Sequence, residues 1–151
     1  MTDDVESNIL NRAFVCKYSD DQEEETEVFL PKENWTPKEF MEELTKIQPI
    51  HVNLVEMNVS DYILDELLPY AHLIYGLYLS DNFFTDKSLE ILQNFSELRF
   101  LGMENNSLNH PSLEHLLALT HLQHLDLTYN KIDPSELEAI RTKLEGVRVI
   151  F

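Results

Sequence analysis

Three asparagines, Asn82, Asn106 and Asn130, lie 24 residues apart, and each occupies the same place in a recurring pattern of apolar residues. The 24-residue unit is numbered here so that position 1 falls at Ile74, Leu98 and Leu122, and the asparagines then stand at position 9. Apolar residues recur at position 4 (Leu77, Leu101, Leu125), position 6 (Leu79, Met103, Leu127) and position 11 (Phe84, Leu108, Ile132). A spacing this regular indicates stacked repeats, in which each unit buries its apolar side chains against its neighbours.

The two halves of the unit have different periodicities. Positions 4 and 6 alternate, which predicts a short strand with one buried face and with positions 3, 5 and 7 on the opposite face. A second apolar set has the spacing of a helix face, at position 16 (Leu89, Leu113, Leu137), position 19 (Leu92, Leu116, Ile140) and position 22 (Phe95, Leu119). Each unit is therefore predicted to be a strand, a turn at the asparagine and a returning helix.

The pattern LxxLxLxxNxL with a helical second half resembles the leucine-rich repeat family, over residues 49–151. The resemblance implies an α/β fold: a short right-handed solenoid with parallel strands on its concave side and helices on its convex side. It also implies that each turn asparagine bonds, through its amide, to backbone groups of the turn and of the neighbouring repeat. Those groups would otherwise be buried without partners.

The repeat continues less regularly in both directions. With Pro49 at position 1, a first unit of 25 residues has Val52, Leu54 and Val59 at the strand and turn positions, but Met57 stands in place of the asparagine. Residues 147–151 are predicted to form a last strand, with Val149 and Phe151 facing inward and Phe151 held by Arg141 and Leu144. The segment 49–151 is thus interpreted as about four repeats and a terminal strand.

Helix-start signals agree with this frame. Asp133 and Pro134 suit the N-cap and first helical positions, and Glu136 is expected to reach back to the start of its helix. Thr36-Pro37-Lys38-Glu39 has the same form. Pro111 is expected to begin a helix after Asn109 and His110.

Residues 1–48 lack the repeat. The segments 12–18 and 25–30 are rich in β-branched and aromatic residues and flank Ser19-Asp20-Asp21-Gln22, which predicts a β-hairpin. Residues 36–48 carry an apolar stripe of helical spacing. We interpret 1–48 as an N-terminal hairpin-plus-helix cap that forms one cooperative domain with the repeats.

The chain carries 28 acidic residues against 11 Lys and Arg, a net charge of −17. This charge opposes direct binding to nucleic acid or to an acidic membrane, and it favours fast association with a basic protein. Maintenance of solubility remains an alternative reason for it. A single cysteine, Cys16, and the absence of a signal-like start or a membrane-length apolar run predict a cytoplasmic protein, monomeric when free.

The outward strand positions and the following turn are expected to form the binding site, because the frame lines them up across the repeats. Aromatic and charged side chains gather there, as in protein interfaces. Packing of these aromatics on one another is the alternative. Gly76 and Gly102 either open a pocket or accommodate larger neighbours. The candidate partner-binding residues are Glu56, Tyr78, Asp81, Phe100, Glu104, His124, Asp126 and Tyr129.

Catalytic and metal sites have little support in the sequence. The spacing of the histidines His110 and His115, or His121 and His124, places neither pair on one helix face, and no metal or cofactor is predicted. Known catalytic motifs are absent, although the acids at 56, 81, 104 and 126 leave an unrecognised carboxylate pair as an enzymatic alternative. The sequence thus predicts a non-enzymatic module that binds a basic protein through an acidic and aromatic concave face. The alternative is an immunity or inhibitor protein that neutralises a basic nuclease or nucleic-acid-binding protein.

Overall fold

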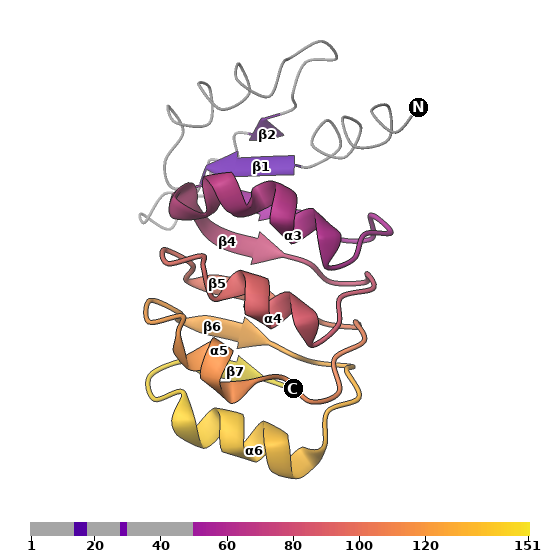
Figure 1. The fold of residues 1–151 in the computed structure, drawn as a ribbon, viewed down its shortest axis with the longest axis vertical. Helices are drawn as coiled ribbons and strands as arrows, with labels where there is room; N and C mark the ends of the chain where they lie inside the picture. The colour runs from indigo at the N-terminus through magenta and orange to yellow at the C-terminus, as the bar shows by residue number, and fades with distance from the viewer. Residues whose placement is uncertain (1–13, 18–27, 30–49) are drawn as a thin grey trace.

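A computed structural model describes residues 14–17, 28–29 and 50–151. Five parallel strands, one for each repeat and one at the C-terminal end, stack side by side (Figure 1). They are β3 (Ile50–Asn53), β4 (Ile74–Tyr78), β5 (Phe100–Gly102), β6 (His124–Asp126) and β7 (Arg148–Ile150). From β4 onward the register advances by 24 residues per strand, so the repeat length in the sequence equals the strand-to-strand step.

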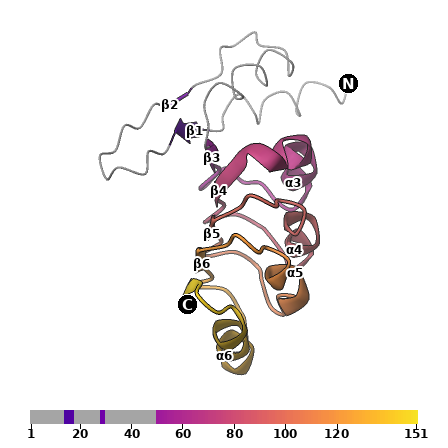
Figure 2. The ribbon, with the colours of Figure 1, turned by 90° about the vertical axis from the view of Figure 1, so that its left-hand side faces the viewer.

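Helices return the chain from each strand to the next, and all of them cover the same side of the sheet (Figure 2). They are α3 (Tyr62–Leu67), the 3₁₀ helix η1 (Leu68–Leu73), α4 (Lys87–Leu92), α5 (Leu113–Leu117) and α6 (Pro134–Lys143). The opposite side of the sheet carries no helix in the part of the chain that the structure describes. We call that side the strand face.

Two further strands extend the sheet beyond β3. The segments β1 (Phe14–Lys17) and β2 (Val28–Phe29) pair antiparallel, and β1 also pairs antiparallel with β3. The two strand segments expected near the N-terminus therefore do pair, and they join the edge of the repeat sheet. The connection at 18–27 and the helix expected at 36–48 lie outside the described residues.

The core lies between the sheet and the helices, where the repeat frame places it. Leu77, Leu101 and Leu125 at position 4 have no exposed surface, and Leu92 and Leu116 close the layer from the helix side. Two position-16 residues, Leu113 and Leu137, are only partly buried and pack at the margin of this cluster. Because every unit shares its apolar layer with the next, no repeat has a core of its own.

The three asparagines form a ladder of hydrogen bonds that joins successive repeats. Each Oδ1 accepts the backbone N–H of position 11 in the preceding repeat, and each Nδ2 donates to carbonyl oxygens at position 6 of the preceding repeat and positions 6 and 7 of its own. Asn106, for example, accepts from Phe84 at 3.0 Å and donates to Leu79 at 3.0 Å and Met103 at 3.2 Å. Asn82 and Asn130 repeat this arrangement. This role of the asparagines is confirmed.

Position 9 of the first repeat holds Met57 instead of an asparagine, yet the turn is still hydrogen-bonded. The N–H of Met57 donates to Oδ1 of Asn82 at 3.1 Å, so the next repeat supplies the acceptor.

A second inter-repeat contact, not predicted from the sequence, lies where the turns enter the helices. The carboxylate of Asp61 accepts the backbone N–H of Thr85 at 2.9 Å and its hydroxyl at 2.6 Å. One repeat later, Asp86 accepts the N–H groups of Asn109 and His110, both at 3.0 Å. Each aspartate thus holds the turn of the following repeat rather than capping its own helix.

The predicted frame of the first repeat agrees with the register from His51 onward, because His51, Val52 and Asn53 pair with Gly76, Leu77 and Tyr78 at the same positions of the next repeat. Pro49 itself lies outside the described residues. The fully buried Ile50 pairs with Ile74, so the register shifts by one residue here and Tyr75 is the extra residue in β4.

Two helix starts also differ from the sequence-based expectation. Helix α5 begins at Leu113 rather than at Pro111, because the hydroxyl of Ser112 caps it by accepting from His115. At α6 the expected Asp133 cap and Pro134 start are present. Glu136, however, bonds to the His110 ring at 3.0 Å instead of reaching back.

The last strand is present, and Val149 packs partly buried against the core. Phe151 was expected to face inward, but 37% of its surface is exposed. The Arg141 guanidinium lies 4.2 Å from the centre of its ring, so the predicted contact is made at the surface rather than in the core.

The ladder gives a test of the repeat frame. Replacing Asn106 with Ala removes the acceptor of the buried Phe84 N–H and a donor to three carbonyls, and should lower the free energy of unfolding by about 1–3 kcal/mol. Thermal unfolding should show a decrease of roughly 2–4 °C for each kcal/mol lost. Asn109→Ala is the control, because that side chain is exposed and donates only to Ser107 of the same turn. Equal melting temperatures for the two variants would contradict the assigned role.

Candidate functional site

The outward side chains of the strand face stand in rows, because position 3 of each strand pairs with position 3 of the next, and likewise for position 5. The position-3 row runs His51, Gly76, Phe100, His124, Arg148, and the position-5 row runs Asn53, Tyr78, Gly102, Asp126, Ile150. Beyond them, position 7 holds Val55, Ser80, Glu104 and Thr128. Five of the eight predicted partner-binding residues lie on this face: Tyr78, Phe100, Glu104, His124 and Asp126.

Three rings form a cluster at the N-terminal end of the strand face. The ring centre of His51 lies 5.9 Å from that of Tyr78 in a stacked arrangement and 5.6 Å from that of Phe100. The Nδ1 atom of His51 also lies 3.1 Å from the Tyr78 hydroxyl oxygen, within hydrogen-bond distance. Tyr78 and Phe100 are partly buried, and only 3% of His51 is exposed. Tyr78 and Phe100 therefore each pack on the His51 ring.

The two strand glycines explain how this cluster fits. A Cβ atom at Gly76 would lie 2.3 Å from Nδ1 of His51, so the imidazole occupies the space that any other residue would need. A Cβ atom at Gly102 would lie 3.0 Å from a carboxylate oxygen of Glu104 and 3.7 Å from the Tyr78 ring. Both glycines accommodate larger neighbours, and Gly76 does so under a buried ring.

Acidic groups lie next to the cluster, toward the C-terminal ends of the strands. Glu104 accepts a short hydrogen bond from the Ser80 hydroxyl, which holds its carboxylate across two strands. Asp126 accepts the backbone N–H of Thr128 at 2.9 Å. Within the described residues, neither carboxylate has an ion pair, so their negative charge is not neutralised there. Both carboxylates are thus oriented by neutral hydrogen-bond donors.

The other three predicted residues, Glu56, Asp81 and Tyr129, lie in the turns and not on the strands themselves. Together with Asn105 they occupy position 8, and all four have left-handed backbone conformations with φ between 48° and 58°. This conformation is unfavourable for a bulky residue such as tyrosine. Tyr129 is nevertheless 83% exposed, so its ring does not compensate by packing in the core.

The pKa values of two histidines are shifted in opposite directions, one by burial and one by a hydrogen bond to a carboxylate. Burial lowers the pKa of His51 below its usual 6.5, because the charged ring would lose water. Since the unfolded chain then binds the proton more readily, His51 stabilises the fold fully above pH 6.5, and this contribution falls as the pH drops below that value. The exposed His110 has a raised pKa because its ring bonds to the Glu136 carboxylate.

Two features of this surface were missed in the sequence. The repeat frame places His51 at an outward position, but its ring is buried at the centre of the cluster. In the sequence, only Gly76, which pairs with His51, indicates that there is space for this ring. Phe83 was not considered, although 58% of it is exposed. Its place between the inward Asn82 and Phe84 could have identified it as outward.

The described residues contain no group of three or more His, Cys, Asp or Glu side chains that could hold a metal ion. Over the same ranges, no helix has the length and apolar character needed to cross a membrane.

Comparison with known proteins identifies the class. Residues 121–142, from the end of the third repeat into α6, match the leucine-rich repeat family. The chain therefore contains a leucine-rich repeat segment, as the asparagine spacing indicated. Repeats of this kind are typical of protein–protein interaction modules and are generally not enzymatic. No curated protein matches the chain.

One similar solved structure is a leucine-rich repeat protein of Leptospira interrogans, with 26% identity and a TM-score of 0.47. The match covers 62% of this chain and 22% of that one, so this chain corresponds to only a small part of that protein.

Because of the ring cluster, alanine at Gly76 is expected to destabilise the protein more than alanine at Gly102. Gly76→Ala should destabilise the protein by about 1–3 kcal/mol, because a buried ring must move to admit the methyl group. Gly102→Ala should cost clearly less, because the atom it meets is the end of a flexible glutamate. Denaturant unfolding measures both.

The double variant Gly76→Ala/His51→Ala tests whether the His51 ring causes the destabilisation expected for Gly76→Ala. If His51 is the obstruction, the added methyl group should cost much less in a His51→Ala background than in the wild type. An equal cost in both backgrounds would show that the ring does not require the glycine.

Proposed function

We propose that the protein is a non-enzymatic interaction module that binds a basic protein partner through the strand face. The observation that carries the proposal is the juxtaposition of the fixed Tyr78 and Phe100 rings with the oriented carboxylates of Glu104 and Asp126. Aromatic side chains provide contact area at interfaces, and charged groups around them select the partner.

The rigidity of this face supports binding. Tyr78 stacks on a buried histidine and lies within hydrogen-bond distance of it, so little side-chain entropy remains to be lost when a partner covers the ring. Glu104 is similarly restrained by Ser80. We infer that Tyr78, Phe100, Glu104 and Asp126 form the centre of the interface. His124 and the turn residues Glu56, Asp81 and Tyr129 lie around it.

The charge of the chain supports a basic partner. The net charge of −17 attracts a positively charged protein over long distances, and the unneutralised acids of the strand face would direct it to that surface. Binding that neutralises a basic nuclease or nucleic-acid-binding protein is the more specific form of this function. The same features favour it, because a surface that binds phosphate backbones is basic.

We further infer that residues 1–48 act as the N-terminal cap of a right-handed solenoid and that the whole chain unfolds as one domain. The antiparallel pairing of β1 with β3 supports the first inference, since it covers the edge of the repeat sheet. A single cysteine favours a cytoplasmic location, and the strong negative charge favours a monomer.

Association kinetics test the binding proposal, with a partner isolated by affinity capture and identified by mass spectrometry. Glu104→Lys/Asp126→Lys should slow association by roughly tenfold or more, and the wild-type rate should fall steeply with salt while dissociation changes little. Glu114→Lys/Glu145→Lys is the control, because it changes the net charge equally at exposed residues that are not on a strand, one in α5 and one in the turn after α6.

Two results would contradict the proposal. One is an equal loss of association rate in both double variants, which would assign the effect to net charge alone. The other is an association rate that does not depend on salt. Tyr78→Ala and Phe100→Ala should each weaken binding by about 1–3 kcal/mol, so unchanged affinity in both would exclude the strand face as the interface.

A further inference from the structure

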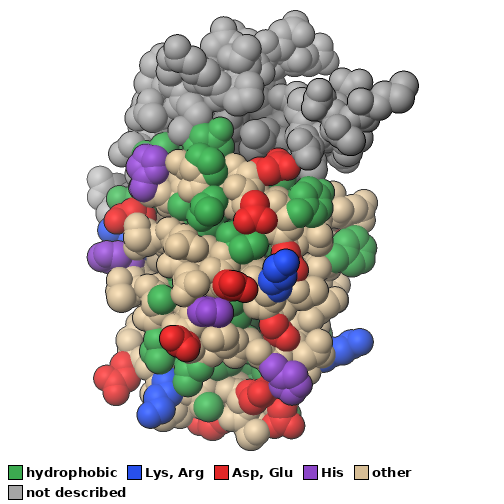
Figure 3. All heavy atoms as spheres, viewed as in Figure 1, with side chains coloured by type: hydrophobic (Ala, Val, Ile, Leu, Met, Phe, Trp, Pro, Cys, Tyr) green, Lys and Arg blue, Asp and Glu red, His purple; other side chains and the backbone are tan. Residues whose placement is uncertain are grey.

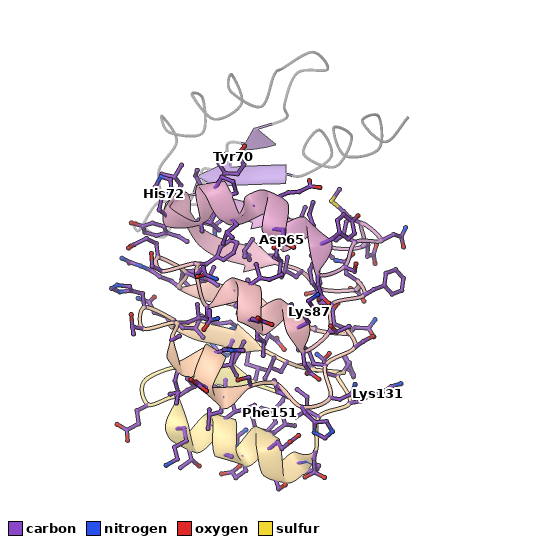
Figure 4. All side chains as sticks on the ribbon, viewed as in Figure 1. Asp65, Tyr70, His72, Lys87, Lys131 and Phe151 are labelled. Atoms are coloured by element: carbon purple, nitrogen blue, oxygen red, sulfur yellow. The ribbon has the colours of Figure 1, made fainter. Side chains whose placement is uncertain are left out.

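Exposed aromatic side chains gather on a second surface, where the strands end and the helices begin. Six large hydrophobic residues are exposed in the described part of the chain, and three of them, Tyr62, Phe83 and Tyr129, belong to the connections between a strand and the following helix or to its first residue. We call this side the loop edge. In Figure 4 it is the right-hand edge, where Lys131 is labelled, and Figure 3 shows hydrophobic side chains at the upper part of the same edge.

Tyr62 and Phe83 come from neighbouring repeats that hydrogen bonds hold together at this point. The N–H of Phe83 donates to the carbonyl of Val59 at 3.0 Å, and the carboxylate of Asp61 accepts from the N–H and hydroxyl of Thr85. The segments 59–62 and 83–85 therefore lie side by side.

The backbone in this region also fixes where the aromatic rings point. Phe84 is fully buried, so Phe83 before it faces outward, with 58% of its surface exposed. Tyr62 is 46% exposed. The Phe83 backbone is bonded to the preceding repeat, and Tyr62 directly follows Asp61, whose side chain is bonded to the next repeat, so the backbone that carries both rings is restrained and the entropy cost of binding through them is lower.

The segments 56–62 and 81–87 carry four acidic residues, Glu56, Asp61, Asp81 and Asp86, and one base, Lys87. Glu56 and Asp81 occupy the left-handed turns just before the two rings, and Asp81 accepts from the Asn105 side-chain amide at 2.6 Å. Glu56 and Asp81 form no ion pair with any residue in the described ranges. An apolar centre with a charged rim is typical of protein contact sites. Because this rim is negative, it favours a positively charged partner. A second copy of this chain would bring the same negative rim and be repelled.

We propose that the loop edge of the first two repeats, formed by Glu56, Tyr62, Asp81 and Phe83, is a second protein-contact surface. It binds a basic segment that inserts one aromatic or aliphatic side chain between Tyr62 and Phe83. This surface is separate from the strand face, so a partner can occupy either one or extend over both.

Amide NMR shifts test this proposal without a known partner. The probe is a synthetic peptide with one tryptophan flanked by two lysines on each side, titrated at 150 mM salt. Saturable shifts are expected in residues 56–62 and 81–86. Peptides with glutamate in place of lysine, or serine in place of tryptophan, should bind at least tenfold more weakly.

Matched variants locate the contact. Phe83→Ser should weaken the lysine–tryptophan peptide at least fivefold, whereas Leu117→Ser, at a residue 46% exposed beyond the loop edge at the end of α5, should not. Tyr62→Ser provides a second variant should Phe83→Ser lower the melting temperature.

Failure to bind the peptide, equal binding by the glutamate peptide, or shifts confined to the strands would overturn the proposal. The last result would leave the strand face as the binding surface, so the two proposals fail separately.

Discussion

The amide side chains of three asparagines connect the repeats, and the rest of the structure depends on these hydrogen bonds. Parallel strands joined through a sharp turn leave backbone groups that water cannot reach, and each such group would cost about 1–3 kcal/mol if it remained without a partner. Asn82 and Asn106 are themselves buried and have both a donor and an acceptor group. One side chain therefore satisfies the turn of its own repeat and that of the preceding one.

The position of the ladder determines which side chains are available for binding. Because position 9 turns inward between positions 6 and 11, the residues at 3, 5 and 7 face the open side of the sheet, and position 8 adopts a left-handed conformation. Gly76 then allows the His51 ring to cross a strand and pack on Tyr78 and Phe100. The backbone thus repeats regularly, whereas the outward side chains differ from one repeat to the next, and the proposed functions depend on these side chains.

The sequence predicts the repeated part of this fold well, because a 24-residue period imposes the same strand register on every unit. The buried positions follow from that period, and the Asn contacts follow from the resemblance to leucine-rich repeats. The side-chain arrangement of the strand face was less predictable. His51 occupies an outward position by number, but its burial depends on the glycine in the next strand, which lies 25 residues away. The Asp61 and Asp86 contacts were also missed, since a helix-start aspartate usually caps its own helix.

Hydrogen exchange of individual backbone amides tests most directly whether the asparagine ladder holds the repeats together. The N–H groups of Phe84 and Leu108 lie in turns but donate to Oδ1 of Asn106 and Asn130. They should therefore exchange as slowly as the N–H of Leu79, which donates to Gly102 in the adjacent strand. If Phe84 and Leu108 instead exchanged many times faster than Leu79, the asparagines would not hold the repeats together, and the fixed strand face would lose its physical basis.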